Sequence, residues 1–509
     1  MQRMKQTALD LYAWFERRLQ LEAPVKEAVL HSVPRETASW WYVFGSAAFT
    51  LLFLQIFTGI LLALVYVPSA GEAWRSLNVL NHEIPLGWFL RAMHGWGSNF
   101  MVAIVLIHMA QVFLFGAYKF PRELTWILGV FLLLMTLGMA FTGQVLRFDQ
   151  DAYWGLGIGA SIMSRVPLIG GGLVHLMLGG PIIAGATLSR FFALHVFVIP
   201  GMLLLFVFLH VWMVLKLGVN DWPMPGRVVR RDTYLQEYHQ LSHTDGIPFV
   251  PGAFWKDLIF SGAILAAVAV CAVVFGPFGP GGQPDPSIIQ TVPKPDFFFL
   301  WIYTILSYLP PQMETPFLLV VPILTIAVLL ALPLVAAEGE KSWHRRPVAV
   351  LVVSTLAVSW GVLTQLGTTT PWSPHMNAWS GDSLPVNRIH DAAPLVREGA
   401  VVFQAKQCRN CHSVGGSGGE RGPALDTVAA RLTIDQMRFK VVTGGGNMPA
   451  YGKNLSPSEI EALVNFLETL HPANEPPAYD ASRRTIEASR SATGTVPAAN
   501  THTDSGATP

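Results

Sequence analysis

The chain has 509 residues, of which 51% are hydrophobic and 13% are charged. Average soluble proteins are about 25% charged, so this composition excludes an ordinary soluble globular protein and indicates a multi-span membrane protein. The formal net charge is +1, which gives no indication of a nucleic-acid partner.

Apolar runs long enough to cross a bilayer as helices predict an all-α membrane bundle. Before them, residues 1–35 mix apolar and basic side chains, as helices that lie on a membrane surface do. Basic loops fall on the side of the N-terminus, so we expect that side to be cytoplasmic in a bacterial membrane and the C-terminal region to lie outside. Seven spans are expected, at residues 40–67, 88–115, 124–142, 191–215, 254–275, 316–337 and 347–366.

Four histidines lie inside these apolar spans, where an imidazole is costly and indicates a functional site. His94 and His108 are fourteen residues apart in the second span, and His195 and His210 are fifteen apart in the fourth. At about 1.5 Å per residue, the two members of a pair are about 22 Å apart along a helix. Two facing helices can therefore hold two stacked haem irons, each between two imidazoles, whereas zinc requires about four ligands.

Glycines in the first and third apolar segments repeat this interval. Gly45 and Gly59 are fourteen residues apart, as are Gly129 and Gly143. Glycine has no Cβ, so these positions allow a flat porphyrin to press against the helices. The alternative is that glycine is common in membrane helices and that each histidine hydrogen-bonds a neighbour.

The C-terminal region carries the motif Cys408-Arg-Asn-Cys411-His412. In a Cys-x-x-Cys-His motif the two thiols attach haem covalently and the histidine ligates the iron. A zinc site or a redox-active cysteine pair is the alternative, but neither explains His412, and the chain has only one further cysteine. We expect Met448 to be the second axial ligand, with Met437 as its rival.

Several motifs together resemble cytochrome b of the bc-type quinol-oxidising complexes. They are Arg91-x-x-His94, Arg190-Phe-Phe-Ala-Leu-His195, Lys256-Asp257 at the start of the fifth span, and the four glycines. The histidine interval of fifteen and the seven spans resemble the photosynthetic branch of that family. The C-terminal region resembles class I cytochrome c, and the fused arrangement is similar to the cytochrome b/c subunits of bacterial menaquinol reductases.

The resemblance implies roles for the residues of the two b haems. His94 and His195 would hold a low-potential haem near the outer face, with Arg91 and Arg190 close to its propionates. The other two membrane histidines would hold a high-potential haem near the cytoplasmic face. Val43 stands where the photosynthetic branch has a cysteine that attaches an extra haem, so we expect no covalent haem in the membrane part.

The resemblance also implies two quinone sites. Lys256 and Asp257 would lie near an inner, quinone-reducing site, and an outer, quinol-oxidising site would form between residues 143–190 and 276–316. The family's Pro-Glu-Trp-Tyr motif at the outer site is replaced here by Pro-Asp-Phe-Phe, in which Asp296 keeps a carboxylate that can accept a quinol proton. The alternative is that Asp296 only caps a short helix.

As implied by the resemblance, the chain is a subunit of a quinol–cytochrome c reductase. Quinol oxidised at the outer face would send one electron through a separate Rieske iron–sulfur protein to the c haem. The other electron would cross the membrane through both b haems in a proton-translocating Q cycle. The implied partners are a menaquinone pool, a downstream cytochrome or oxidase, and a second copy of the complex in a homodimer. Two alternatives are a haem b/c conduit without quinol bifurcation, serving another respiratory oxidoreductase, and a haem-binding anchor.

These features predict six regions along the chain. They are a surface helix region (1–35), a four-helix haem b domain (36–220), a three-span quinone-site domain (221–366), a linker (367–391), a cytochrome c domain (392–475) and a disordered tail (476–509).

Overall fold

A computed structural model of the chain describes most of its residues. The described residues are 2–20, 22, 23, 26, 31–180, 183–285, 294–369, 384, 392–406, 408–418, 422–444, 448, 451, 452 and 455–478. Most of the predicted linker and of the predicted tail therefore lies outside them. Two compact units result, one formed by residues 1–284 and 291–371 and the other by residues 285–290 and 372–509.

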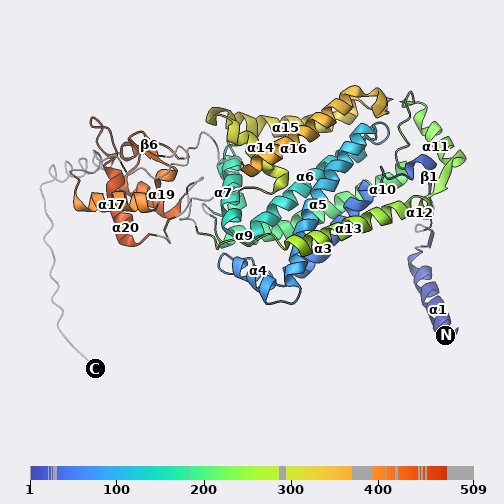
Figure 1. The fold of residues 1–509 in the computed structure, drawn as a ribbon, viewed down its shortest axis with the longest axis horizontal. Coiled ribbons are helices and arrows are strands. Elements are labelled where there is room, and N and C mark those ends of the chain that lie inside the picture. Colours follow the sequence, from blue (N-terminus) through green and yellow to red (C-terminus); the bar gives the residue numbers. More distant parts are fainter. Residues whose placement is uncertain are drawn as a thin grey trace. The chain divides into compact units, whose positions relative to one another are not determined.

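Seven of the described helical segments are long and apolar enough to cross a membrane, which confirms the predicted spans (Figure 1). Six of them are single helices, and the fourth is a composite of three helical pieces over Gly185–Leu217. The single helices are α3 (Phe44–Ala63), α5 (Gly87–Leu114), α6 (Glu123–Leu146), α13 (Phe254–Phe275), α15 (Pro311–Val335) and α16 (Pro347–Thr369).

The composite segment contains a π-helical turn that includes the first of its two histidines. Helix α9 (Gly185–Ala193) leads into the turn η2 (Leu194–Val198), and α10 (Ile199–Leu217) follows with Pro200 near its start. Proline has no N–H to donate to the preceding turn, and a π turn accommodates one extra residue in a helix. An interval of fifteen residues therefore spans nearly the same rotation as fourteen in a regular helix, which corrects the regular-helix geometry expected for His195 and His210.

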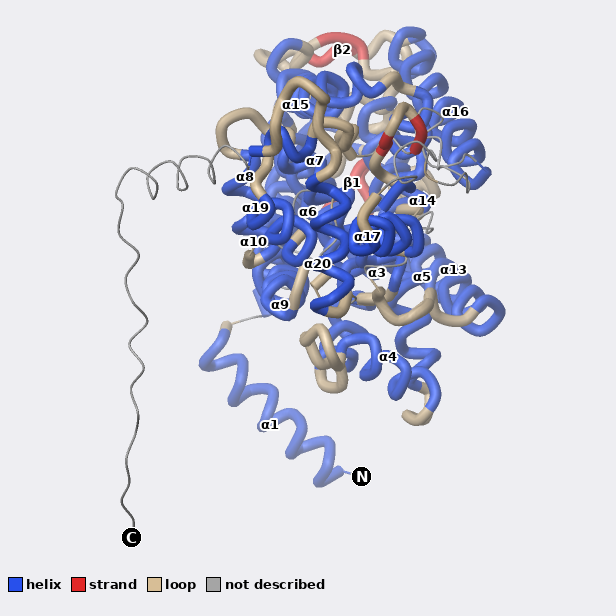
Figure 2. The backbone as a smooth tube through the Cα atoms, turned by 90° about the vertical axis from the view of Figure 1, so that its left-hand side faces the viewer, coloured by secondary structure: helices blue, strands red, loops and turns tan. Residues whose placement is uncertain are grey.

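The membrane unit also contains shorter elements. The helices are α1 (Gln2–Leu19), α4 (Ala73–His82), α7 (Gln150–Ser164), α8 (Gly170–Leu178), α11 (Tyr234–Thr244), α12 (Phe249–Gly252) and α14 (Phe297–Tyr308), with 3-10 turns η1 (Arg35–Thr37) and η3 (Trp343–Arg345). The strands form two short antiparallel pairs, β1 (Ser32–Pro34) with β3 (Gly246–Pro248), and β2 (Val228–Val229) with β4 (Gly339–Glu340). Figure 2 shows how small the strands are beside the helices.

The first four membrane segments pack in two pairs around a common apolar core. Helix α3 packs along α5, α6 packs along α10, and α13 contacts both α3 and α5. Leu51, Met101, Leu203 and Val268 are buried together where these helices meet. Outward-facing residues such as Phe208 are apolar but exposed, which suits a lipid-facing surface rather than a water-facing one.

The second unit has its own helices and its own core. Its elements are α17 (Pro394–Ala405), the 3-10 turn η5 (Cys408–Asn410), β5 (Ser413–Val414), β6 (Ser417–Gly418), α18 (Val428–Arg431), α19 (Ile434–Thr443) and α20 (Pro457–Glu468). Helix α17 packs against α20, where Gly399 lies so close to Ala462 that a Cβ would meet the backbone. The rings of Phe403 and Phe466 are 5.4 Å apart at the centre of this contact.

Candidate functional site

Each of the four membrane histidines lies against one of the four predicted glycines. A Cβ added at Gly59 would lie 3.3 Å from Cε1 of His94, and one at Gly143 would lie 2.8 Å from Cε1 of His195. The same pairing holds at the other level: a Cβ added at Gly45 would lie 3.5 Å from Cε1 of His108, and one at Gly129 would lie 3.7 Å from Cε1 of His210. The glycines of α3 and α6 thus leave room beside the imidazoles of α5 and of the composite helix.

The imidazoles of His94 and His195 face each other across the bundle, with ring centroids 6.3 Å apart. Two imidazole–metal bonds of about 2 Å each, together with the distance from each ring centroid to its coordinating nitrogen, add up to about this separation. The described residues contain no group of three or more His, Cys, Asp or Glu side chains that could hold a metal ion. The donor set therefore fits a metal that brings its own equatorial ligands, as haem iron does.

A threonine hydroxyl contacts each histidine of this level. Thr58 Oγ1 lies 2.8 Å from Nδ1 of His94, and Thr142 Oγ1 lies 3.0 Å from Nδ1 of His195. Sequence patterns alone do not single out these threonines. The available signal is that each immediately precedes a predicted glycine, Gly59 or Gly143.

The other two histidines line a cavity of about 530 Å³, which is a usual size for a cofactor or ligand pocket. His108 and His210 share this cavity with Gly45 and Gly129. Asp257, which is 9% exposed, lines the same cavity.

Three further residues belong to the surroundings of this cavity. Lys256, which was predicted with Asp257, donates to the carbonyl of Ala38. His31 and Arg122 line the cavity although the sequence gives no specific signal for them. His31 is held by stacking on Phe249, at 5.1 Å between ring centroids.

The two arginines predicted near haem propionates differ in their surroundings. Arg91 is 8% exposed and donates to the carbonyls of Phe278 and Gly279 and, at 3.1 Å, to Asn81 Oδ1. Arg190 is exposed and donates to the carbonyl of Leu176. Arg91 therefore ties α5 to the segment before residue 285, and Arg190 ties α9 to α8.

Asp296 is the N-cap residue of helix α14, which agrees with the alternative in position, but its side chain makes no capping hydrogen bond. It caps the helix through its backbone carbonyl, which accepts the N–H of Phe299 at 2.9 Å, so its carboxylate is not used for capping. Burial raises the pKa of the Asp296 carboxyl, and the neighbouring Arg147 only partly opposes this. A carboxylate with a raised pKa is better matched to taking up a proton near neutral pH.

In the second unit, the motif Cys408-Arg-Asn-Cys411-His412 forms one tight turn. His412 donates from Nδ1 to the carbonyl of Pro423 at 2.8 Å, which leaves Nε2 free to bind a metal. Burial, and then the neighbouring Cys411 thiol, raises the pKa of Cys408 to about 12. Redox-active cysteines have a lowered pKa instead, so this environment argues against a redox cysteine pair.

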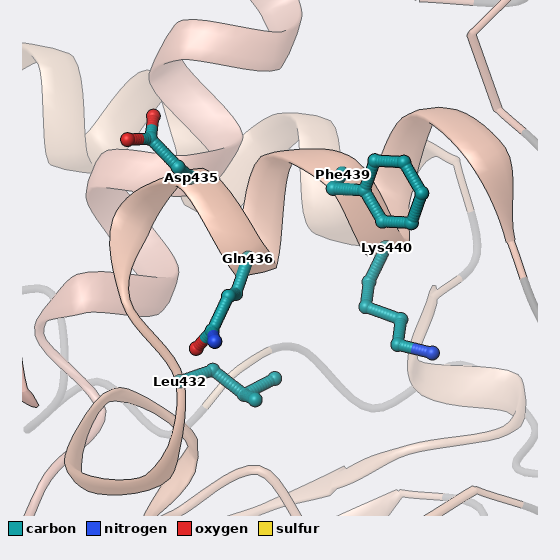
Figure 3. Close-up of a pocket in the computed structure, with 5 residues that line it drawn as sticks. All are labelled: Leu432, Asp435, Gln436, Phe439 and Lys440. Atoms are coloured by element: carbon teal, nitrogen blue, oxygen red, sulfur yellow. The ribbon is translucent and has the colours of Figure 1, made fainter.

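The two candidate methionine ligands lie in different places. Met448 is partly buried and packs against the same core as Cys408, whereas Met437 is 2% exposed within that core. A separate surface depression of about 330 Å³ on and beside α19 contains none of the predicted haem residues; it is lined by Leu432, Asp435, Gln436, Phe439 and Lys440 (Figure 3).

Comparisons with known proteins follow this division. Residues 30–218 match the family described as cytochrome b/b6/petB, and residues 285–381 match cytochrome b(C-terminal)/b6/petD. Residues 394–467 match the family described as cytochrome C oxidase, cbb3-type, subunit III.

Individual relatives agree. Cytochrome b6 of Synechococcus elongatus is 36% identical over 210 residues, covering 41% of this chain and 97% of that protein. Cytochrome b of Allochromatium vinosum is 30% identical over 363 residues, covering 68% of this chain and 87% of that protein. A solved structure described as hyperthermophilic respiratory Complex III superimposes with a TM-score of 0.61 at 27% identity, covering 70% of this chain and 91% of that one. The chain therefore belongs to the cytochrome b family and carries a C-terminal cytochrome c-type domain.

Proposed function

We propose that this chain is the cytochrome b/c subunit of a quinol–cytochrome c reductase, which oxidises quinol at the outer membrane face and carries electrons across the membrane. Membership of the cytochrome b family implies haem binding and membrane electron transfer together with other subunits. The observation that carries the proposal is the one-to-one pairing of four glycines with four histidines at two levels of the bundle.

The chain's own residues would hold three haems, which supply one-electron carriers when bound. His94 and His195 would hold the first b haem, and His108 and His210 would hold the second. In the second unit, Cys408 and Cys411 would attach the c haem covalently, and His412 and Met448 would bind its iron. The free Nε2 of His412 and the paired glycines support these assignments.

Asp296 would accept a proton from quinol at the outer site. Its raised pKa, caused by burial, suits this role. At the inner face, Asp257 and Lys256 would flank the quinone-reducing end of the cavity that His108 and His210 line. Menaquinone is the quinone we infer from the fused b/c arrangement.

The complex requires an iron–sulfur partner. Three cysteines are present in the whole chain, and two of them belong to the haem motif, so the chain has no ligand set for an iron–sulfur cluster. We infer a separate Rieske protein, a downstream cytochrome or oxidase as acceptor, and a homodimeric complex. The N-terminus is assigned to the cytoplasmic side and the c-type domain to the outer side because of the basic loops.

Quinol-dependent cytochrome reduction by the purified complex tests the role of Asp296. Asp296→Asn should slow the reaction by about 100-fold or more, the usual contribution of a general base, and Asp296→Glu should retain most of it. Because burial raises the pKa of Asp296, the wild-type rate should increase as pH rises through that value, and the asparagine variant should lose this dependence. Equal rates in wild type and Asp296→Asn would remove Asp296 from the mechanism.

The second candidate function is a haem b/c conduit without quinol bifurcation. It is favoured by the replacement of the family's Trp-Tyr by Phe297-Phe298, which removes a hydroxyl from the outer site. Inhibition by quinol analogues that act at the outer site supports the reductase. Complete insensitivity to them would favour the conduit.

A further inference from the structure

The two histidine levels differ in what faces Nδ1 of their imidazoles. At the His94–His195 level, each Nδ1 lies within hydrogen-bond distance of a threonine hydroxyl, at 2.8 Å from Thr58 and 3.0 Å from Thr142. At the His108–His210 level no hydroxyl takes this place: among the described residues, Nδ1 of His108 has no hydrogen-bond partner, and the only acceptor close to the His210 ring is the backbone of Thr125.

The direction of the threonine hydrogen bonds follows from their other partners. Thr58 donates its single hydroxyl hydrogen to the carbonyl of Leu54 at 2.6 Å, and Thr142 donates to the carbonyl of Gly138 at 2.8 Å. A hydroxyl has one hydrogen, so each oxygen can only accept from the imidazole. Both Nδ1 atoms therefore carry the ring proton, and both Nε2 atoms are free for a metal.

The two levels also differ in the residue that precedes each glycine. Thr58 and Thr142 each stand one residue before the glycine that their histidine faces. At the other level, the residues before Gly45 and Gly129 are Phe44 and Leu128, whose side chains cannot accept a hydrogen bond.

We propose that Thr58 and Thr142 are positioning residues that lower the redox potential of the haem at the His94–His195 level relative to the haem at the His108–His210 level. An acceptor on Nδ1–H makes an imidazole a more basic ligand, and a more basic axial ligand favours the oxidised iron. Second-shell hydrogen bonding is one of the means by which proteins set haem potentials. The inference rests on the proposed assignment of the four histidines as haem ligands. It adds that the downhill direction of electron transfer between the levels is set in part by two hydroxyl groups.

Redox titration of the two b-type absorbance components in the purified complex tests this inference. In Thr58→Val and Thr142→Val, the midpoint potential of the lower-potential component should rise, and the other midpoint should stay unchanged. Thr58→Ser and Thr142→Ser keep the hydroxyl and should restore the wild-type value. Thr50→Val is the matched control on α3, because Thr50 also donates to a carbonyl one turn earlier, that of Ser46 at 2.9 Å.

A reciprocal variant keeps the test decisive even where a valine variant fails to assemble. Leu128→Thr places a hydroxyl one residue before Gly129, and it should lower the midpoint of the higher-potential component. If both b bands remain, midpoints that are unchanged in the valine variants would overturn the inference. Serine variants whose midpoints shift as much as those of the valine variants would do the same. Absence of b-type bands from the wild-type protein would instead overturn the proposed function itself.

Discussion

At the scale of single residues, the space beside the membrane histidines depends on glycine. At Gly143, a Cβ would lie only 2.8 Å from Cε1 of His195, closer than carbon atoms pack in protein interiors. A methyl group there must displace either the imidazole or whatever the imidazole binds. Glycine, whose side chain is a single hydrogen atom, is therefore required here by the site. Helix stability does not explain it, because glycine weakens a helix interior by about 1 kcal/mol relative to alanine.

Gly143→Ala should reduce the b haem content of the complex from two haems per c haem towards one. The added methyl group competes with the ring at the His94–His195 level, and the level about 20 Å away along the helices should keep its haem. Reduced-minus-oxidised spectra with a redox titration measure both components. Gly138→Ala is the control on the same helix, because a Cβ there meets only Ile199 Cδ1 at an ordinary 3.8 Å. Full b content with unchanged potentials in Gly143→Ala would argue against a ring seated on this glycine.

Residue types with a strict pattern could be predicted from the sequence, and residues defined by a tertiary contact could not. His94 and Gly59 stand out because their interval repeats within apolar spans. Thr58 is one of several threonines in these helices, and only the close approach of α3 to α5 shows that it meets His94. His31 lies outside the apolar spans, just before β1, and lines the cavity beside the pairing of β1 with β3.

At the scale of elements, the apolar runs predicted all seven spans because bilayer thickness dictates helix length. The π turn η2 could not be predicted, since hydropathy is insensitive to one extra residue in a helical run. Its only trace in the sequence is the interval of fifteen beside three intervals of fourteen, together with Pro200. An unequal interval between matched ligands is thus a sign of a local change in helix geometry.

A buried ionic cluster joins the elements at one end of the membrane unit. Asp221, which follows α10, is fully buried and accepts hydrogen bonds from Tyr234 of α11 at 2.6 Å and from Lys341. Arg227 Nη1 lies 3.2 Å from its other carboxylate oxygen. One carboxylate therefore connects the loop after α10, the start of α11 and the loop between β4 and η3.

Asp221→Asn should destabilise the membrane unit strongly, because removing one partner of a buried ion pair leaves the other charge uncompensated, at a cost of about 3–5 kcal/mol. Thermal loss of the b bands in detergent at neutral pH measures the effect. Asp232→Asn is the control, since Asp232 lies in the same loop and is exposed. Equal thermal stability of Asp221→Asn and wild type would show that the cluster is not a structural tie.

The stability supplied by Asp221 should depend on pH with a definite sign. Burial raises the pKa of this carboxyl, but the charge and hydrogen bond of Lys341, together with Tyr234 and Arg227, outweigh burial and hold the pKa below its ordinary value. A carboxyl whose pKa is lower in the folded state stabilises that state when the pH is above its pKa in the unfolded chain, about 3.9. This stabilisation is lost as the pH falls through its pKa in the folded state. The difference in thermal stability between wild type and Asp221→Asn should therefore be largest at pH 7 and should decrease progressively below about pH 4.

At the scale of the whole molecule, the chain joins two units that bury separate cores. Leu51, Met101 and Val268 belong to the core of the membrane unit, whereas Phe403 and Phe466 belong to that of the c-type unit. Composition and the Cys-x-x-Cys-His motif predicted both units. Because each unit has a core formed by its own residues, the ability to bind haem should be separable as well.

A chain that ends at Thr369 should therefore keep both b-type components and lose all covalent haem. Covalent haem survives denaturation, so haem staining of a denaturing gel measures the c haem, and spectra of the native protein measure the b haems. In the full-length chain, Cys408→Ser with Cys411→Ser should give the same spectra without removing the unit, because thiols and not folding of the membrane part attach that haem. Loss of the b bands in the cysteine variant would contradict independent haem binding. Loss of the b bands in the truncated chain, but not in the cysteine variant, would mean that the membrane unit needs the c-type unit for assembly. The b haems would still not need the c haem.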